Sequence, residues 1–168
     1  MSGILVPSDG SPNSLYGVRH VVNAFRRNPG LEIHVINVQR PFSSQVARFT
    51  SRQDRMAFHQ KQSEKALEPA RRMLDGSGIP YTIHSEVGDK ADCIANAARR
   101  LRCERIVMST ARRSSLARWI GDSVTNQVSE RTTVPVEVIA GDAASTLESV
   151  GIPAGIGAGL FALGMAAD

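Results

Sequence analysis

The feature that most constrains the fold of this chain is the alternation of short apolar runs with longer segments of helical periodicity. Runs of this length favour buried strands. The runs that predict strands are residues 3–7, 31–38, 79–87, 105–108 and 134–139. The segments that predict helices are residues 12–27, 54–74, 90–101 and 124–131. Strands alternating with helices predict an α/β domain with a mostly parallel sheet and helices on both faces.

A turn with its own signals joins the first strand to the first helix. Residues 8–12 are dense in turn-forming residues. Ser11 is predicted to cap the helix and Pro12 to occupy its first position, where the missing N–H of proline costs nothing. The apolar residues that follow at helical spacing are Leu15, Val18, Val21, Val22 and Phe25. Further along, the pair Gly88-Asp89 predicts a turn and the cap of the third helix.

Two stretches lack a convincing period and are predicted to be loops. Residues 39–53 hold a proline, serines and three arginines, and residues 109–123 hold a short apolar insert. The three arginines of the first stretch are Arg40, Arg48 and Arg52.

The composition excludes several classes of protein. A chain of 168 residues with 42% hydrophobic and 21% charged residues is the size of one ordered domain. Cys93 and Cys103 make no disulfide scaffold and have no metal-ligand spacing, so reduced thiols are predicted. The histidines are scattered, and no nucleophile motif is present, so neither a catalytic set nor a metal site is predicted. The first residues lack the pattern of a signal peptide, and a cytoplasmic location is expected.

The distribution of charge separates a basic body from an acidic and apolar tail. All 20 Lys and Arg residues precede residue 132, and the charged residues of 141–168 are all acidic. The densest basic run, residues 99–105, has no interleaved aromatic residues, which predicts a solvated surface and no nucleic-acid binding. We therefore divide the chain into a domain, 1–140, and a tail, 141–168.

The tail allows three interpretations. Residues 149–167 are uncharged and just reach the minimum length of a membrane span. Five glycines and Pro153 weaken a helix there and no basic cluster flanks it, so a span is not expected. A helix packed on a dimer or on another protein is the second interpretation, since Gly155 and Gly159 are spaced for close approach. The favoured interpretation is a poorly ordered or partner-docked tail.

Several segments together resemble the universal stress protein family. They are the opening ILVPSDGS (residues 4–11), the turn Gly88-Asp89, the run IVMST (residues 106–110), the pair Ser123-Val124 and the VPV of residues 134–136. The resemblance covers residues 3–140 and implies a flavodoxin-like, adenine-nucleotide-hydrolase-like fold. That fold has five parallel strands and a turning point between strands one and four.

The resemblance also implies a homodimer that forms through the last strand. The interface would contain Val134, Val136 and Val138. An apolar edge strand is prone to aggregate unless it is covered, so pairing there is physically reasonable.

Many members of this family bind ATP through three spaced glycines, whose backbone N–H groups approach the phosphates. At the matching positions this chain has Ser109, Arg112 and Asp122, and only the hydroxyl of Ser123 is kept. Ser109 adds a side chain where the loop would approach a phosphate, and Asp122 adds a repelling negative charge. Arg112 and its neighbouring arginines, in contrast, are able to pair with phosphates.

This chain matches the family's base-facing residues better than it matches the phosphate loop. The resemblance assigns Asp9 to the adenine, the Val38 backbone to the base and Gly88 to the ribose. Each residue also has a purely structural interpretation. Asp9 would hold its turn, Val38 would belong to the core, and Gly88 would supply a conformation that other residues avoid.

Two hypotheses about function follow. The first is a non-catalytic stress-response module that acts as a homodimer and does not bind ATP through the usual glycine loop. The second is an ATP-binding stress-response switch with an arginine-lined phosphate site. No cofactor is firmly implied, and ATP is the single candidate.

Overall fold

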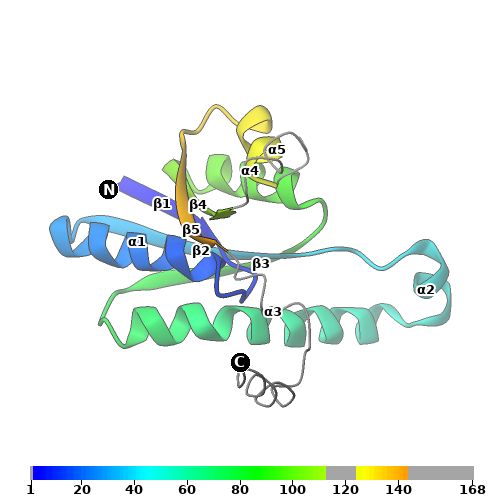
Figure 1. The fold of residues 1–168 in the computed structure, drawn as a ribbon. Helices are drawn as coiled ribbons and strands as arrows, with labels where there is room; N and C mark the ends of the chain where they lie inside the picture. The colour runs from blue at the N-terminus through cyan, green and yellow to red at the C-terminus, as the bar shows by residue number, and fades with distance from the viewer. Residues whose placement is uncertain (1, 113–123, 144–168) are drawn as a thin grey trace, which may run out of the picture.

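A five-stranded parallel sheet forms the centre of the molecule (Figure 1). The computed structural model describes residues 2–112 and 124–143. The strands are β1 (Ser2–Pro7), β2 (Leu31–Gln39), β3 (Tyr81–Val87), β4 (Cys103–Arg112) and β5 (Val136–Ala143). Their order is β3-β2-β1-β4-β5, with every neighbouring pair parallel. The predicted five-stranded α/β fold, with its turning point between β1 and β4, is confirmed.

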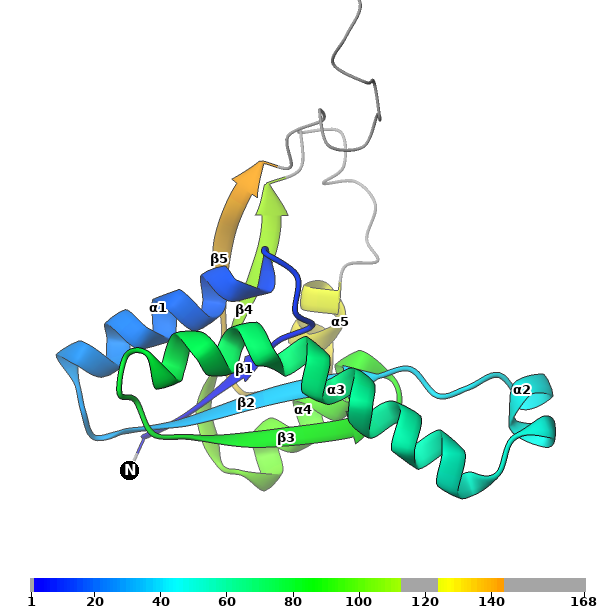
Figure 2. The same ribbon diagram turned by 90° about the horizontal axis from the view of Figure 1, so that it is seen from below.

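Helices cover both faces of the sheet, as predicted (Figures 1 and 2). One face carries α1 (Ser14–Arg27) and α3 (Arg52–Asp75), and the other carries α4 (Lys90–Arg100) and α5 (Val124–Arg131). Alternate residues of the strands supply the two cores. On β2, Ile33 and Val35 join the α1/α3 core, and Ile36 and Val38 join the α4/α5 core. This alternation is the period of a strand that is buried on both faces.

The helix α1 begins later than predicted, but its predicted cap is present. The regular helix starts at Ser14, not at Pro12. The Ser11 hydroxyl accepts the backbone N–H of Ser14 at 3.1 Å, which is the hydrogen bond of a capping residue. Gly10 precedes this turn with φ 81° and lies against the backbone of Ala66 in α3. The β1–α1 turn is therefore fixed both to α1 and to α3.

The prediction of a loop over residues 39–53 was wrong in part. A short helix, α2 (Ser44–Phe49), lies inside that stretch, and α3 already begins at Arg52. Two serines start these helices, because Ser43 and Ser51 accept backbone N–H groups from Val46 and Asp54. A helix of six residues is too short to show an apolar period, so only the capping serines could have revealed it.

Strands β4 and β5 both run further than predicted. Pairing continues beyond Met108↔Val138 to Arg112↔Ala143. The added residues are small or polar, and they continue the backbone pairing of the two strands. Strand β5 thus passes the predicted boundary at residue 140. The rest of the tail, 144–168, lies outside the described residues. Within the described parts of the chain, no helix has both the length and the apolar character needed to cross a bilayer.

Candidate functional site

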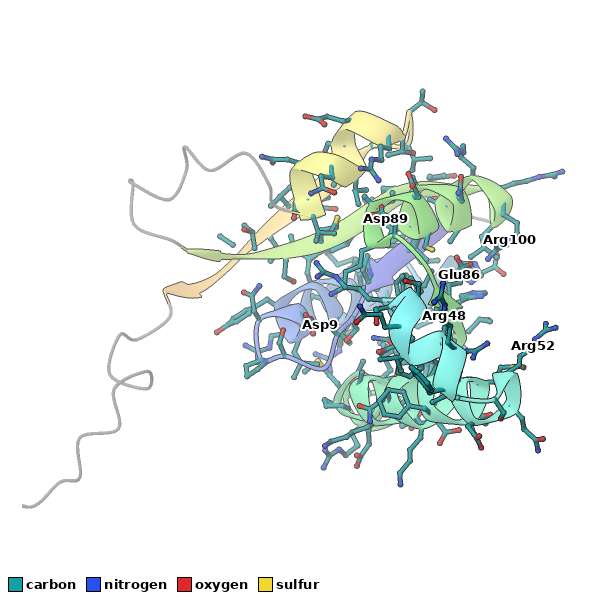
Figure 3. All side chains as sticks on the ribbon, turned by 90° about the vertical axis from the view of Figure 1, so that its right-hand side faces the viewer. Asp9, Arg48, Arg52, Glu86, Asp89 and Arg100 are labelled. Atoms are coloured by element: carbon teal, nitrogen blue, oxygen red, sulfur yellow. The ribbon has the colours of Figure 1, made fainter. Side chains whose placement is uncertain are left out.

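The residues assigned to a nucleotide site lie at the carboxyl edge of the sheet. All five strands are parallel, so their carboxyl ends and the loops that follow them meet at this edge. Ligands of such sheets bind there, beside the turning point. Figure 3 looks onto this edge and shows Asp9, Glu86 and Asp89 on it.

Asp9 is an exposed carboxylate held in a defined position. Its Oδ1 atom accepts the backbone N–H of Ser11 at 3.0 Å. Partial burial would raise the pKa of Asp9, but hydrogen bonds with Ser11 and Ser14 and the positive charge of Lys90 outweigh it. The net pKa lies below the ordinary value. Asp9 is therefore ionised at neutral pH and suited to accept a hydrogen bond from an amino group. It also holds its own turn, so both predicted roles are compatible.

The backbone of Val38 faces the space above the end of β1. The last pair between β1 and β2 is Pro7↔Ile36, and the N–H of Ser8 donates to the Ile36 carbonyl at 2.9 Å. Strand alternation turns the backbone groups of Val38 to the same side as those of Ile36, beyond the end of β1. The Val38 side chain is buried in the α4/α5 core. The side chain thus has the structural role, and the backbone has the orientation that a base contact needs.

Asn37 fixes the spacing between the Asp9 turn and Val38, a role that sequence reasoning did not identify. Its buried side-chain amide donates to the Ser8 carbonyl at 2.7 Å, and its Oδ1 accepts from Gln39 at 2.6 Å. This buried amide ties the end of β2 to the turn that carries Asp9. A polar residue between the apolar residues Ile36 and Val38 was the available signal.

The side chain of Ser109 is directed at α1. Its Oγ atom accepts the N–H of Gly17 at 2.7 Å, one of the backbone groups that a helix start leaves unpaired. A Cβ atom at Gly17 would lie 2.9 Å from that oxygen. The serine at the first glycine position is therefore part of the packing between β4 and α1.

Gly88 is required for space and not for an unusual backbone angle. Its φ is not in the left-handed region, whereas those of Gly10 and Gly78 are. A Cβ atom at Gly88 would lie 2.7 Å from the sulfur of Cys93. The prediction that Gly88 supplies a special conformation was wrong. Its lack of a side chain lets the β3–α4 turn pack on α4.

The predicted cap at Asp89 is confirmed, and it belongs to an ion-pair group. Asp89 Oδ1 accepts the N–H groups of Ala91 and Asp92 at 3.0 Å each. Arg131 of α5 contacts Asp89 at 2.6 Å and Asp92 at 3.0 Å. Sequence reasoning missed this link between α4 and α5, because the partners are far apart in the chain. It also missed Lys90, which follows the cap and faces Asp9.

The remaining phosphate positions are only partly described. Arg112 lies at the end of β4, opposite Ala143 of β5. Asp122 and Ser123 lie outside the described residues. The structure thus brings Asp9, Val38, Gly88 and Ser109 to one edge and does not test the rest of the predicted loop.

The residues predicted to form a dimer interface lie on or beside the outermost strand. β5 is at the edge of the sheet, next to β4 only. Val134 and Val136 are half-buried and pack against the α4/α5 core. Val138 is 48% exposed. The interface itself stays a prediction.

A pocket of about 410 Å³ lies beside α3 and the end of β3. Met56, His59, Leu67 and Val87 are among its lining residues. None of Asp9, Val38, Gly88 and Ser109 lines it, so it is separate from the predicted nucleotide residues.

Two of the histidines that looked scattered in the sequence are neighbours in the sheet. His34 Nδ1 lies 3.1 Å from His84 Nε2, between β2 and β3. His20 pairs with Glu137 at 2.8 Å. Among residues 2–112 and 124–143, no group of three His, Cys, Asp or Glu side chains is placed to hold a metal ion. Cys93 and Cys103 are free thiols, and burial raises the pKa of Cys103 to about 11.

The histidine pair predicts a loss of stability in acid. Burial, and after it the charges of His34 and Arg100, lower the pKa of His84, while Glu86 opposes this. The unfolded chain then binds more protons as the pH falls from about 6.5 through the folded pKa, so the folded state loses stability over that window. One group contributes at most about 1.4 kcal/mol per pH unit. Thermal melting between about pH 7.5 and pH 5 should show a smaller decrease for His84→Gln than for the wild type.

The control for this experiment is His59→Gln, which removes a histidine outside the pair. It should retain the wild-type dependence on pH. Equal dependence in His84→Gln and the wild type would show that His84 does not carry the effect.

Comparisons with known proteins agree with this geometry. Residues 1–140 match the sequence model described as the universal stress protein family. The solved structure of the hypothetical protein MJ0577 is similar with a TM-score of 0.66 and 22% identity, over 83% of this chain and 95% of that chain. A universal stress protein in complex with cAMP is similar with a TM-score of 0.64 and 18% identity, over 82% and 96%. A family protein from Arabidopsis thaliana with AMP bound is similar with a TM-score of 0.59 and 17% identity, over 92% and 99%. A comparison with curated protein sequences gave no match.

Proposed function

Because this chain belongs to the universal stress protein family, we propose that it is a non-catalytic, homodimeric stress-response module that recognises the adenosine part of a nucleotide. In this proposal the phosphates are not held by a glycine loop. The observation that carries it is the difference between the two ends of the site. At the end assigned to the base, hydrogen bonds hold the Asp9 turn and the end of β2 in place. At the end assigned to the phosphates, Ser109 occupies the first glycine position, and its hydroxyl accepts the N–H of Gly17.

The base end offers the groups that an adenine needs. An ionised carboxylate at Asp9 accepts a hydrogen bond from the exocyclic amino group, and the backbone of Val38 presents groups to the ring edge. Asn37 holds these two positions at a fixed separation. Similar structures are named for complexes with cAMP and with AMP, both of which have one phosphate. These names support a ligand whose base and ribose dominate recognition.

The residues at the phosphate end of the site favour a smaller contribution of the phosphates to binding. Three glycines would let backbone N–H groups approach a triphosphate, and the sequence has Ser109, Arg112 and Asp122 instead. A carboxylate at position 122 repels phosphate oxygens. The alternative, an arginine-lined phosphate site, remains the second candidate because Arg112 is the last residue of β4, at this edge of the sheet.

Titration with AMP by calorimetry tests the base end. We expect Asp9→Ala to weaken AMP binding about 10- to 100-fold, because it removes a charged hydrogen-bond acceptor. The matched control is Asp75→Ala, which removes the same charge at the end of α3, next to Tyr81. Unchanged affinity in Asp9→Ala, or absence of AMP binding in the wild type, would contradict adenosine recognition at this site.

The proposed dimer predicts a large effect at the sheet edge. Val138→Asp would place a buried carboxylate on each side of a two-fold interface. We expect the dissociation constant of the dimer to rise at least about 100-fold, measured by analytical ultracentrifugation. Val87→Asp is the matched control, since Val87 is 49% exposed on β3, the opposite edge strand. A Val138→Asp protein that stays dimeric, or a monomeric wild type, would contradict pairing through β5.

A further inference from the structure

The segment that the sequence predicted as a loop projects from the body of the protein. We call residues 40–61 the arm; it consists of α2 and the first turns of α3. Figures 1 and 2 show the arm beyond the carboxyl edge of the sheet, at the far end of the molecule from the end of α1. The core does not reach this far, because the residues of α3 that pack into it begin at Leu67. The arm is therefore placed to contact another surface before the rest of the protein does.

Several large apolar side chains of the arm are exposed. Phe49, at the end of α2, is 90% exposed, and Met56 of α3 is 62% exposed. Val46 and Phe58 are also exposed. Exposed apolar side chains that occur singly need no explanation, but a group on one projecting element indicates an interaction surface.

The arm is also strongly basic. It contains five Lys or Arg residues and one acidic residue, Asp54. Asp54 is bonded to the Ser51 hydroxyl in the cap of α3. Arg40, Arg48 and Arg52 are exposed, and within the described chain none of them forms an ion pair, unlike Arg100 and Arg131. Figure 3 shows Arg48 and Arg52 on the arm. No carboxylate of the described residues neutralises their charges.

The arm is ordered by its own contacts. Arg55 donates from Nη1 to the carbonyls of Ala47 at 2.8 Å and Thr50 at 2.5 Å, which closes α2 onto α3. The rings of Phe42 and Phe58 pack with their centroids 5.2 Å apart. These contacts fix the exposed apolar residues beside the unpaired arginines.

From this combination we propose that the arm binds the surface of an anionic lipid bilayer. Phe49, Val46 and Met56 enter the interface, and Arg40, Arg48 and Arg52 contact the anionic headgroups. A bilayer fits better than a nucleic acid, since strand-binding proteins stack bases along grooves. This surface is a projecting tip on which Val46 and Met56 are exposed together with Phe49 and Phe58. This inference goes beyond nucleotide recognition and is independent of it.

Cosedimentation of the full chain with vesicles tests the proposal. The vesicles are an equimolar mixture of phosphatidylcholine and phosphatidylglycerol, compared with phosphatidylcholine alone. We expect clear binding to the anionic vesicles, which weakens with added salt, and little binding to the neutral ones. The double variant R48A/R52A should lower the partition coefficient about 30-fold, because each arginine contributes a factor of about five. Phe49→Ser should lower it about tenfold.

The control is R26A/R27A, which removes the same charge at the end of α1. It should change binding less than about twofold, since these residues lie outside the surface potential of the bilayer when the arm is docked. Thermal melting should show that all three variants are folded, because every substituted residue is exposed or half-exposed at the surface.

Three outcomes would overturn the proposal. One is equal binding of the wild type to neutral and anionic vesicles, as a binding mode driven by the uncharged residues 149–167 would give. Another is an equal loss in R26A/R27A and R48A/R52A, which would indicate only the net charge. The third is tighter binding to a single-stranded oligonucleotide than to the vesicles, with the same sensitivity to R48A/R52A, which would assign the arm to nucleic acid.

Discussion

Gly10→Ala is expected to lower the free energy of unfolding by about 4 kcal/mol, the largest effect of any single change considered for this protein. Two separate costs add at this position. Gly10 has φ 81°, a conformation that costs an alanine about 1–2 kcal/mol. A Cβ atom would also lie 2.8 Å from the carbonyl oxygen and 3.0 Å from the Cα of Ala66. Both atoms belong to the backbone of α3, so the turn itself must move.

Gly78→Ala separates these two costs. Gly78 also has a left-handed φ, 65°, but no atom lies within 4 Å of the position of its Cβ. It should therefore lose only about 1–2 kcal/mol. Urea denaturation of both variants measures the difference. Equal losses in Gly10→Ala and Gly78→Ala would show that the contact between the β1–α1 turn and α3 is not tight. Because Asp9 precedes Gly10, the Gly10 variant should also lose affinity for AMP.

Leu74→Ala is expected to cost about 3 kcal/mol of unfolding free energy. Leu74 is fully buried in the core between α1, α3 and the sheet. Its truncation removes apolar contacts and leaves a cavity that the surrounding strands fill only partly. A total stability of about 5–15 kcal/mol makes this a large fraction of the whole.

Met56→Ala is the matched control on the same helix. Met56 lies about five turns before Leu74 along α3 and is 62% exposed on the arm. Its truncation should change stability by less than about 0.5 kcal/mol. Urea denaturation of the pair tests the division of α3 into an anchored half and a projecting half. A cost at Met56 close to the cost at Leu74 would contradict a projecting arm.

The fold was predictable from the sequence because its signals are local and repeated. The clearest case is the first strand, where the apolar run Ile4–Val6 is followed by the Ser8–Pro12 turn. The elements that the prediction missed have no apolar period. Helix α2 has only six residues, and the ends of β4 and β5 are small or polar residues that pair with each other. Such segments take their structure from partners that the local sequence does not reveal.

The hydrogen bonds of the site were predictable only where their partners are adjacent in the chain. The Asp9 turn and the Asp89 cap are local and were found. The Asn37–Ser8 bond, the Ser109–Gly17 bond and the approach of Lys90 to Asp9 join distant segments, and only the sheet order brings them together. Ser109 shows the consequence most clearly. By resemblance it is a serine at a position where the family has glycine. In the structure its hydroxyl accepts a hydrogen bond from Gly17 of α1.

The hydrogen bonds around Asp9, Asn37 and Ser109 agree with the proposed function. The groups proposed to recognise a base lie beside hydrogen bonds to the backbone, from Ser11 to Asp9 at 3.0 Å and from Asn37 to Ser8 at 2.7 Å. The phosphate end has no such arrangement in the part of the chain that is described. A nucleotide should therefore be recognised by its adenosine, with little further gain from additional phosphates.

The ratio of the affinities for AMP and for ATP-Mg, measured by calorimetry on the nucleotide-free wild type, tests this account most directly. We predict that AMP binds and that ATP binds within about threefold of it, which is less than about 0.7 kcal/mol. ATP binding more than about tenfold tighter would contradict the account, because it would require a phosphate site rebuilt around residues such as Arg112. Absence of binding by both nucleotides would contradict adenosine recognition itself.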